Sequence, residues 1–269
     1  MEKVIDIQDA TVQKNGRKLI EHIDWQVNQG EHWAVLGLNG SGKTTLLKVA
    51  AGILWPKAGS GPVDVLGHRY GKTYMPELKK SIGWVSQALD QQYQAHAQAD
   101  ALDIVLSGRH ASVGLYEPVT EDDVERAREL LDRFRIRHLE EAPFAQFSQG
   151  ERKKTLLARA WMADLKLLIL DEPCAGLDVY AREELLDTLE EVTSPGGPTL
   201  LYVTHHLEEV IPSITHALLM KNGRRYDAGK KEDVLQTPHL RDVFQVPMDI
   251  SWRDGRPWVQ VHKRRSGSS

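Results

Sequence analysis

The chain has 269 residues, and 34 Lys and Arg stand against 38 Asp and Glu, which gives a formal net charge of −4 at pH 7. This near-neutral balance provides no electrostatic basis for binding nucleic acid, so no nucleic-acid partner is expected. The single cysteine, Cys174, excludes an internal disulfide framework, and the absence of an apolar run of about eighteen residues excludes a membrane span, so we expect a cytoplasmic protein.

The N-terminal residues have the pattern of short β-strands. Strand-like runs occupy residues 4–7, 25–27 and 33–36, and Asn15-Gly16 is a turn signal between them. We predict a small antiparallel β subdomain that leads into the loop after residue 36.

That loop, Gly37-Leu38-Asn39-Gly40-Ser41-Gly42-Lys43-Thr44-Thr45, is a complete phosphate-binding motif. It fits G-x-x-x-x-G-K-[ST], in which backbone N–H groups cradle phosphates, the lysine reaches the β- and γ-phosphates, and a hydroxyl binds Mg²⁺. The apolar run 33–36 ends at the loop and the helical run 45–51 follows it, which places the phosphate at a helix N-terminus. The loop therefore predicts binding of a nucleoside triphosphate, with Thr44 as a magnesium ligand.

The middle of the chain changes to a helical pattern. A connector rich in Gly and Pro at 56–62 precedes a strand-like run at 63–66, and helical character extends from about 88 to 160. Within it, Thr120-Glu121-Asp122-Asp123 resembles a capping box and predicts a helix start. We expect a helical subdomain there.

Two apolar runs without alternation, 167–170 and 199–203, predict strands of a parallel sheet that is covered on both faces. The first run leads to Asp171 and Glu172 and the second leads to His205, each at the carboxyl end where such sheets bind ligands. Phosphoryl transfer requires a metal anchor and a group that positions water. Asp171 suits Mg²⁺, Glu172 suits polarisation of the attacking water, and a histidine can donate to the γ-phosphate.

The C-terminal residues 236–269 form an extension. Two short β-like runs within 248–262 surround Arg253-Asp254-Gly255-Arg256 and predict a hairpin that packs on the main body. The basic stretch Lys263-Arg264-Arg265 is expected to be a solvated tail, and His96 and His110 lack metal-ligand spacing.

Over residues 1–235 these motifs resemble those of the ATP-binding cassette (ABC) ATPases. The resemblance implies an α/β P-loop NTPase fold: a RecA-like core, an antiparallel β subdomain and an inserted α-helical subdomain at about 88–160. It also assigns further motifs in the order that the family shows: the Q-loop glutamine Gln87, a magnesium ligand; the signature Ser148-Gln149-Gly150-Glu151; the D-loop Ala175-Gly176-Leu177-Asp178; and the switch histidine His205. Gly30-Glu31-His32-Trp33 and the C-terminal extension are similar to a ModF/YlmA-like subgroup.

The resemblance implies ATP hydrolysis with Mg²⁺ by a head-to-tail homodimer. ATP would lie between residues 37–45 of one copy and Ser148, Gln149 and Gly150 of the other, with Asp178 coupling the two sites. Residues 101–109 resemble the helical subdomain of metal-chelate and cobalamin-type importers, which implies a separate membrane permease and a position at the cytoplasmic face of the membrane.

The sequence departs from the family pattern at two places. Gln149 stands where the signature normally has glycine, although Ser148 and Glu151 still form a capping box that predicts a helix start. Residues 11–16 lack the usual adenine-stacking aromatic, which leaves Val12 as an apolar contact.

Two other functions stay open at this point. One is a soluble ATPase that does mechanical or regulatory work on a ribosome or nucleic acid, and the other is a nucleotide-gated binding module with little turnover. The single cassette and the absence of a basic surface disfavour the first, and intact Glu172 and His205 disfavour the second.

Overall fold

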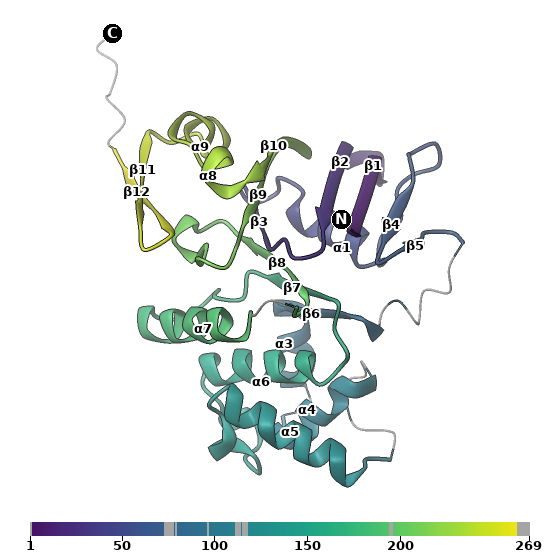
Figure 1. Cartoon of the computed structure of the whole chain (residues 1–269), viewed down its shortest axis with the longest axis vertical. Helices are drawn as coiled ribbons and strands as arrows, with labels where there is room; N and C mark the ends of the chain where they lie inside the picture. Colours follow the sequence, from purple (N-terminus) through teal and green to yellow (C-terminus); the bar gives the residue numbers. More distant parts are fainter. Residues whose placement is uncertain are drawn as a thin grey trace. The chain divides into compact units, whose positions relative to one another are not determined.

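A computed structural model of the chain describes residues 2–72, 78, 80–95, 97–110, 114, 118–193 and 196–262 (Figure 1). The chain divides into two units: Met1–Thr73 with Thr199–Ser269, and Tyr74–Pro198. His96 and the basic stretch 263–265 lie outside the described residues. None of the helices in the described part of the chain is long and apolar enough to cross a membrane.

The first unit contains an antiparallel sheet near the N-terminus. Its order is β2-β1-β4-β5, with the bounds β1 Lys3–Lys14, β2 Arg17–Asn28, β4 Val63–Val65 and β5 His68–Arg69. Lys14 pairs with Arg17 across the Asn15-Gly16 turn. Over residues 20–27 of β2 the buried residues Ile20, Ile23, Trp25 and Val27 are separated by exposed or partly exposed ones, as expected for a sheet with one covered face, whereas β1 is buried without alternation at residues 10–12.

The same unit holds part of a second sheet, in the order β10-β9-β3-β8. Its strands are β3 Trp33–Leu36, β8 Thr199–Thr204, β9 His216–Lys221 and β10 Arg224–Lys230. The prediction that residues 33–36 belong to the antiparallel piece is wrong, because β3 runs parallel to β8 and to β9. All four residues of β3 are buried, which suits a central strand covered on both faces.

The second unit is mainly helical and has two parallel strands, β6 Ile82–Ser86 and β7 Leu167–Asp171. Its helices are α3 Gln87–Gln94, α4 Ala101–Ser107, α5 Glu121–Arg133, α6 Gln149–Trp161 and α7 Val179–Val192, with short 3₁₀ turns η1 Gly108–His110, η2 Arg137–Leu139 and η3 Phe144–Gln146. The predicted capping box at Thr120 and Asp123 is present and starts α5. Ala127 and Leu131 of this helix are fully buried.

The C-terminal part of the first unit follows β10. It consists of α8 Lys231–Val234, α9 Thr237–Phe244 and the strands β11 Met248–Arg253 and β12 Arg256–Val261. β11 and β12 pair antiparallel across Asp254-Gly255, where the sequence predicts a hairpin. The domain boundary at residue 235 stays a prediction.

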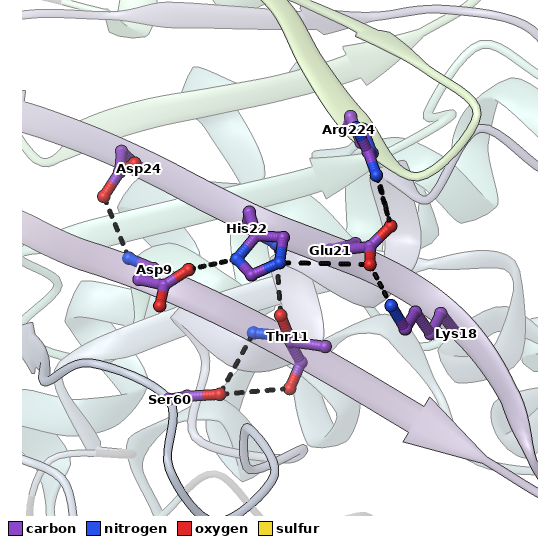
Figure 2. Close-up of polar contacts among 8 residues, drawn as sticks. All are labelled: Asp9, Thr11, Lys18, Glu21, His22, Asp24, Ser60 and Arg224. Atoms are coloured by element: carbon purple, nitrogen blue, oxygen red, sulfur yellow. Dashed lines mark hydrogen bonds and ion pairs between the residues drawn. The ribbon is translucent and has the colours of Figure 1, made fainter.

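A polar cluster lies on the β1–β2 hairpin (Figure 2). Glu21 of β2 accepts hydrogen bonds from Lys18 on the same strand and from Arg224 of β10, the latter at 2.8 Å. Asp9 and His22 adopt positive φ angles of 46° and 50°, and the His22 Nδ1 lies 2.5 Å from the Asp9 carboxylate. The pairing register of β1 and β2 shifts between Ile7 and Ala10, as at a β-bulge. Of these contacts, the hydrogen bond from Arg224 to Glu21 is the one that joins β2 to β10.

The Glu21 carboxylate should make stability depend on pH in the acid range. Hydrogen bonds from Lys18 and Arg224 lower the pKa of Glu21 from its usual 4.5 to about 2. Because the pKa is depressed in the folded state, the stabilisation is present above pH 4.5 and is lost as the pH falls toward 2. We expect Glu21→Gln to have a lower Tm than the wild type at pH 7 and nearly the same Tm at pH 2. A difference in Tm that grew on acidification would contradict this role.

Candidate nucleotide site

The phosphate loop joins β3 to α1 (Lys43–Ala50), as its sequence predicts. Lys43 begins this helix, is only 5% exposed, and donates from Nζ to the carbonyl oxygens of Gly37 at 2.8 Å and Leu38 at 3.2 Å. The loop therefore curls around its own lysine. Gly42 is the N-cap and supplies no side-chain cap to the N–H groups of the first turn.

Two glycines of the loop are required by close packing. A Cβ at Gly37 would lie 2.3 Å from the carbonyl oxygen of Met220, and one at Gly42 would lie 2.7 Å from Ile20 Cγ2. Both glycines also have positive φ, at 150° and 104°. The loop is thus held between β2 and the end of β9, which keeps its backbone N–H groups in a fixed arrangement.

The loop retains hydrogen-bonding capacity that fits a phosphate. The Ser41 hydroxyl oxygen is buried and has no hydrogen-bond partner among the described residues. A buried hydroxyl without a partner is costly unless a ligand or water satisfies it. Together with the Lys43 ammonium, this donor suits the anionic oxygens of a nucleotide.

His205 lies at the same edge of the sheet as the phosphate loop. β3 and β8 are parallel neighbours in which Leu36 pairs with Thr204, so Gly37 and His205 follow paired residues. The His205 side chain is partly buried, whereas His206 is exposed. The first unit thus brings the phosphate loop and His205 together.

Gln87, Asp171 and Glu172 lie at one edge of a parallel strand pair in the second unit. Ser86 of β6 pairs with Asp171 of β7 in parallel register, so Gln87 and Glu172 directly follow paired residues. Glu172 has φ of 51°, a left-handed conformation that costs a non-glycine residue energy and that clusters at functional sites. The structure therefore places Gln87, Asp171 and Glu172 at one strand edge.

The signature and the D-loop lie side by side in the second unit. They line a cavity of about 500 Å³ that includes Ser148, Gln149, Gly150 and Asp178. Asp178 caps α7 by accepting a hydrogen bond from the Ala181 N–H at 2.8 Å. The sequence does not predict where the Gln149 side chain points. Its Oε1 packs against the D-loop, only 2.8 Å from where a Cβ at Gly176 would lie.

Val12 does not suit contact with a base. Its side chain is only 4% exposed. Val12 lies in β1 opposite Ile20 of β2, which is also buried. The expectation that Val12 makes an apolar contact with adenine is therefore wrong, because its side chain is not at the surface.

The predicted capping box of the signature is present at the start of α6. The Ser148 hydroxyl accepts from the Glu151 N–H, and the Ser148 N–H donates to the Glu151 carboxylate at 2.8 Å. Burial raises the pKa of Glu151, but hydrogen bonds from Ser148 and His138 outweigh it, so the net pKa is lowered. The carboxylate is thereby held ionised at the helix N-terminus, where a negative charge is favourable.

Replacing Ser148 with alanine should destabilise this helix start. Loss of an N-cap serine costs about 1 kcal/mol, so we expect a lower midpoint in urea with an unchanged slope. Ser251→Ala is the control, because Ser251 is an exposed serine outside the site. Ser107 is unsuitable for this purpose because it is buried. An unchanged midpoint for Ser148→Ala would show that the cap contributes nothing to stability.

A phosphate loop between a buried parallel strand and a helix, with a histidine at the end of the adjoining strand, defines a P-loop nucleotide-binding protein of the α/β class. The model of the ABC transporter family matches residues 20–175, more than half of the chain. The chain belongs to the ABC transporter family, as an ATP-binding protein, and it is an ATPase.

Individual relatives agree with this assignment. The chain is 40% identical over 258 residues to the ABC transporter ATP-binding protein YlmA of Bacillus subtilis. This match covers 95% of this chain and 96% of YlmA. This similarity confirms the predicted relation to the ModF/YlmA-like subgroup. The chain is also 30% identical over 230 residues to the molybdate import ATP-binding protein MolC of Haemophilus influenzae, covering 86% and 83% of the two chains.

The fold agrees with a solved member of the family. The structure of cbiO1 from Clostridium perfringens, part of the ABC transporter complex cbiONQ, superposes with a TM-score of 0.75 at 27% identity. The match covers 91% of this chain and 96% of cbiO1. The predicted α/β P-loop fold is confirmed.

Proposed function

We propose that this ATPase works as a head-to-tail homodimer that binds ATP between the phosphate loop of one copy and the signature of the other. One observation carries the proposal: the signature and D-loop residues line their own cavity on the second unit, at the N-terminus of α6. A helix N-terminus with a serine hydroxyl suits a phosphate. A second copy would supply the phosphate to this cavity.

Each site residue then has a chemical role. Lys43 offsets phosphate charge, Glu172 polarises the attacking water, and His205 donates a hydrogen bond to the γ-phosphate. Asp178, beside the signature, couples the two sites.

The oxygen donors of Thr44, Gln87 and Asp171 fit a magnesium ion, which prefers hydroxyl, carbonyl and carboxylate ligands. When bound, Mg²⁺ would neutralise charge on the β- and γ-phosphates. These three residues would hold it.

The ATPase would power a transporter, of the import type, through a separate membrane permease, and would lie at the cytoplasmic face of the membrane. Support comes from MolC, a relative named for molybdate import, and from the importer-like residues 101–109. Purification of the tagged chain from detergent-solubilised membranes should retain a protein with several membrane spans, identified by mass spectrometry. Recovery of ribosomal proteins in its place would favour a non-transport role.

Complementation between two inactive variants tests the dimer. Lys43→Met disables the phosphate loop and keeps the signature. Gly150→Asp places a negative charge in the signature, and the new Cβ would have only ordinary contact with Ala181, at 3.4 Å.

In a mixture of the two variants, half of the dimers would be mixed, and each mixed dimer would have one intact composite site. ATPase activity should therefore rise from near zero to about a quarter of the wild type. Sites formed within one chain would give no recovery on mixing, and that result would overturn the proposal.

A further inference from the structure

A buried carboxylate holds the residues on both sides of the switch histidine. Glu209 ends the 3₁₀ turn η4 (Leu207–Glu209) and is only 3% exposed. It accepts hydrogen bonds from the hydroxyls of Thr204 at 2.6 Å and Tyr202 at 3.1 Å. The Thr204 hydroxyl in turn accepts from the N–H of His206 at 3.0 Å. Glu209 therefore holds Thr204 and, through it, the backbone of His206 by hydrogen bonds, and these two residues flank His205.

The C-terminal hairpin holds the turn that contains this glutamate. Arg256 of β12 donates from Nε to the carbonyl oxygen of Glu208 at 3.1 Å. Lys231, only 4% exposed, donates from Nζ to the carbonyl oxygens of Pro212 at 3.0 Å and Gly255 at 3.1 Å. The tip of the hairpin also packs on Pro212, since a Cβ at Gly255 would lie 3.3 Å from Pro212 Cβ.

These contacts form a continuous chain within the first unit. The hairpin holds the backbone of η4 through Arg256, η4 carries Glu209, and Glu209 holds Thr204 directly before the histidine. We infer that the C-terminal hairpin is a positioning element for the switch segment, with Arg256 as the residue that transmits its position to His205. This inference rests on the role proposed above for His205.

The physical basis is the geometric precision that catalysis requires. Removing the Arg256 guanidinium leaves the Glu208 carbonyl without that donor and allows η4 to relax. A small displacement of Glu209 would then reach the histidine through Thr204, and small misplacements at a reacting centre lower the rate strongly. ATP binding depends on the phosphate loop and should change little.

The experiment compares Arg256→Ala with Arg256→Lys and with Arg253→Ala in the full-length protein. Arg253 is the matched control, because it pairs opposite Arg256 in the same hairpin and is exposed. For Arg256→Ala we expect a fall in kcat of about fivefold, with the KM for ATP unchanged within about twofold. Arg256→Lys should restore part of the loss, and Arg253→Ala should match the wild type.

A spectroscopic measurement separates positioning from general damage. In protein labelled with ¹³C-histidine, the imidazole Cε1–H signal of His205 is assigned by its loss in His205→Ala. Arg256→Ala should shift this signal, whereas Arg253→Ala should leave it in place. An unmoved His205 signal in Arg256→Ala would overturn the inference, and so would a wild-type kcat in Arg256→Ala if His205→Ala loses turnover.

The proposed role of the histidine fails in a different way. If His205→Ala kept wild-type turnover while Arg256→Ala still shifted the His205 signal, the hairpin would position a residue that takes no part in hydrolysis. That result would overturn the role of His205 and leave the mechanical link intact. If His205→Ala lost turnover while Arg256→Ala changed neither readout, the role of His205 would stand and the link would be wrong.

Discussion

Replacing Glu172 with glutamine should lower the rate of ATP hydrolysis by at least about 100-fold, the typical contribution of a positioned general base. The amide keeps the size of the side chain but cannot accept a proton from water. ATP binding should persist, because the phosphate loop is untouched, and ATP-bound dimers should accumulate. Steady-state phosphate release measures the first effect, and size-exclusion chromatography with and without ATP measures the second.

Glu191→Gln is the matched control for this variant. Glu191 lies on α7, is 55% exposed, and forms a surface ion pair with Arg135. Exposed pairs of this kind contribute little, so hydrolysis should match the wild type. Normal hydrolysis by Glu172→Gln would show that another group activates the water.

Replacing Lys43 with methionine should weaken ATP binding by about 100-fold, which corresponds to about 3 kcal/mol. Methionine retains most of the apolar stem and removes only the ammonium that lies 2.8 Å from the Gly37 carbonyl. Because the variant removes the donor of the Gly37 and Leu38 carbonyl oxygens, its Tm without ATP should be no higher than that of the wild type. ATP at about 100 times the wild-type Kd should raise the Tm of the wild type strongly and that of the variant only slightly, because this concentration is close to the Kd expected for the variant.

Lys48→Met provides the control on the same helix. Lys48 lies in the last turn of α1, away from the loop, so ATP should stabilise this variant as it does the wild type. Equal stabilisation of Lys43→Met by ATP would show that Lys43 does not contact the nucleotide.

The sequence predicted those parts of the site whose chemistry is local. The phosphate loop, the run that ends at Asp171 and Glu172, and the serine that caps α6 are each contained in a few consecutive residues. Their backbone preferences and hydrogen-bonding groups act over one turn of chain, so the local pattern is sufficient. The same holds for the hairpin turn at Asp254-Gly255.

The errors came from long-range pairing. Residues 33–36 formed a recognisable strand, but their partners β8 and β9 lie more than 160 residues away in the sequence. The burial of Val12 and the contact of Gln149 with Gly176 also depend on neighbours that no local pattern indicates. The signature substitution therefore could not be interpreted before the structure placed Gln149 against the D-loop.

The sequence by itself determined that a phosphate loop, a carboxylate pair and a histidine each follow an apolar run, because these are matters of residue type and short spacing. Only the tertiary structure decided how they are supported. The pairing of β3 with β8 sets His205 beside the loop, and the contact of Arg256 with the Glu208 carbonyl links the C-terminal hairpin to that histidine. These arrangements arise from strand register and from the burial of polar groups that must find partners, and both join residues far apart in the chain.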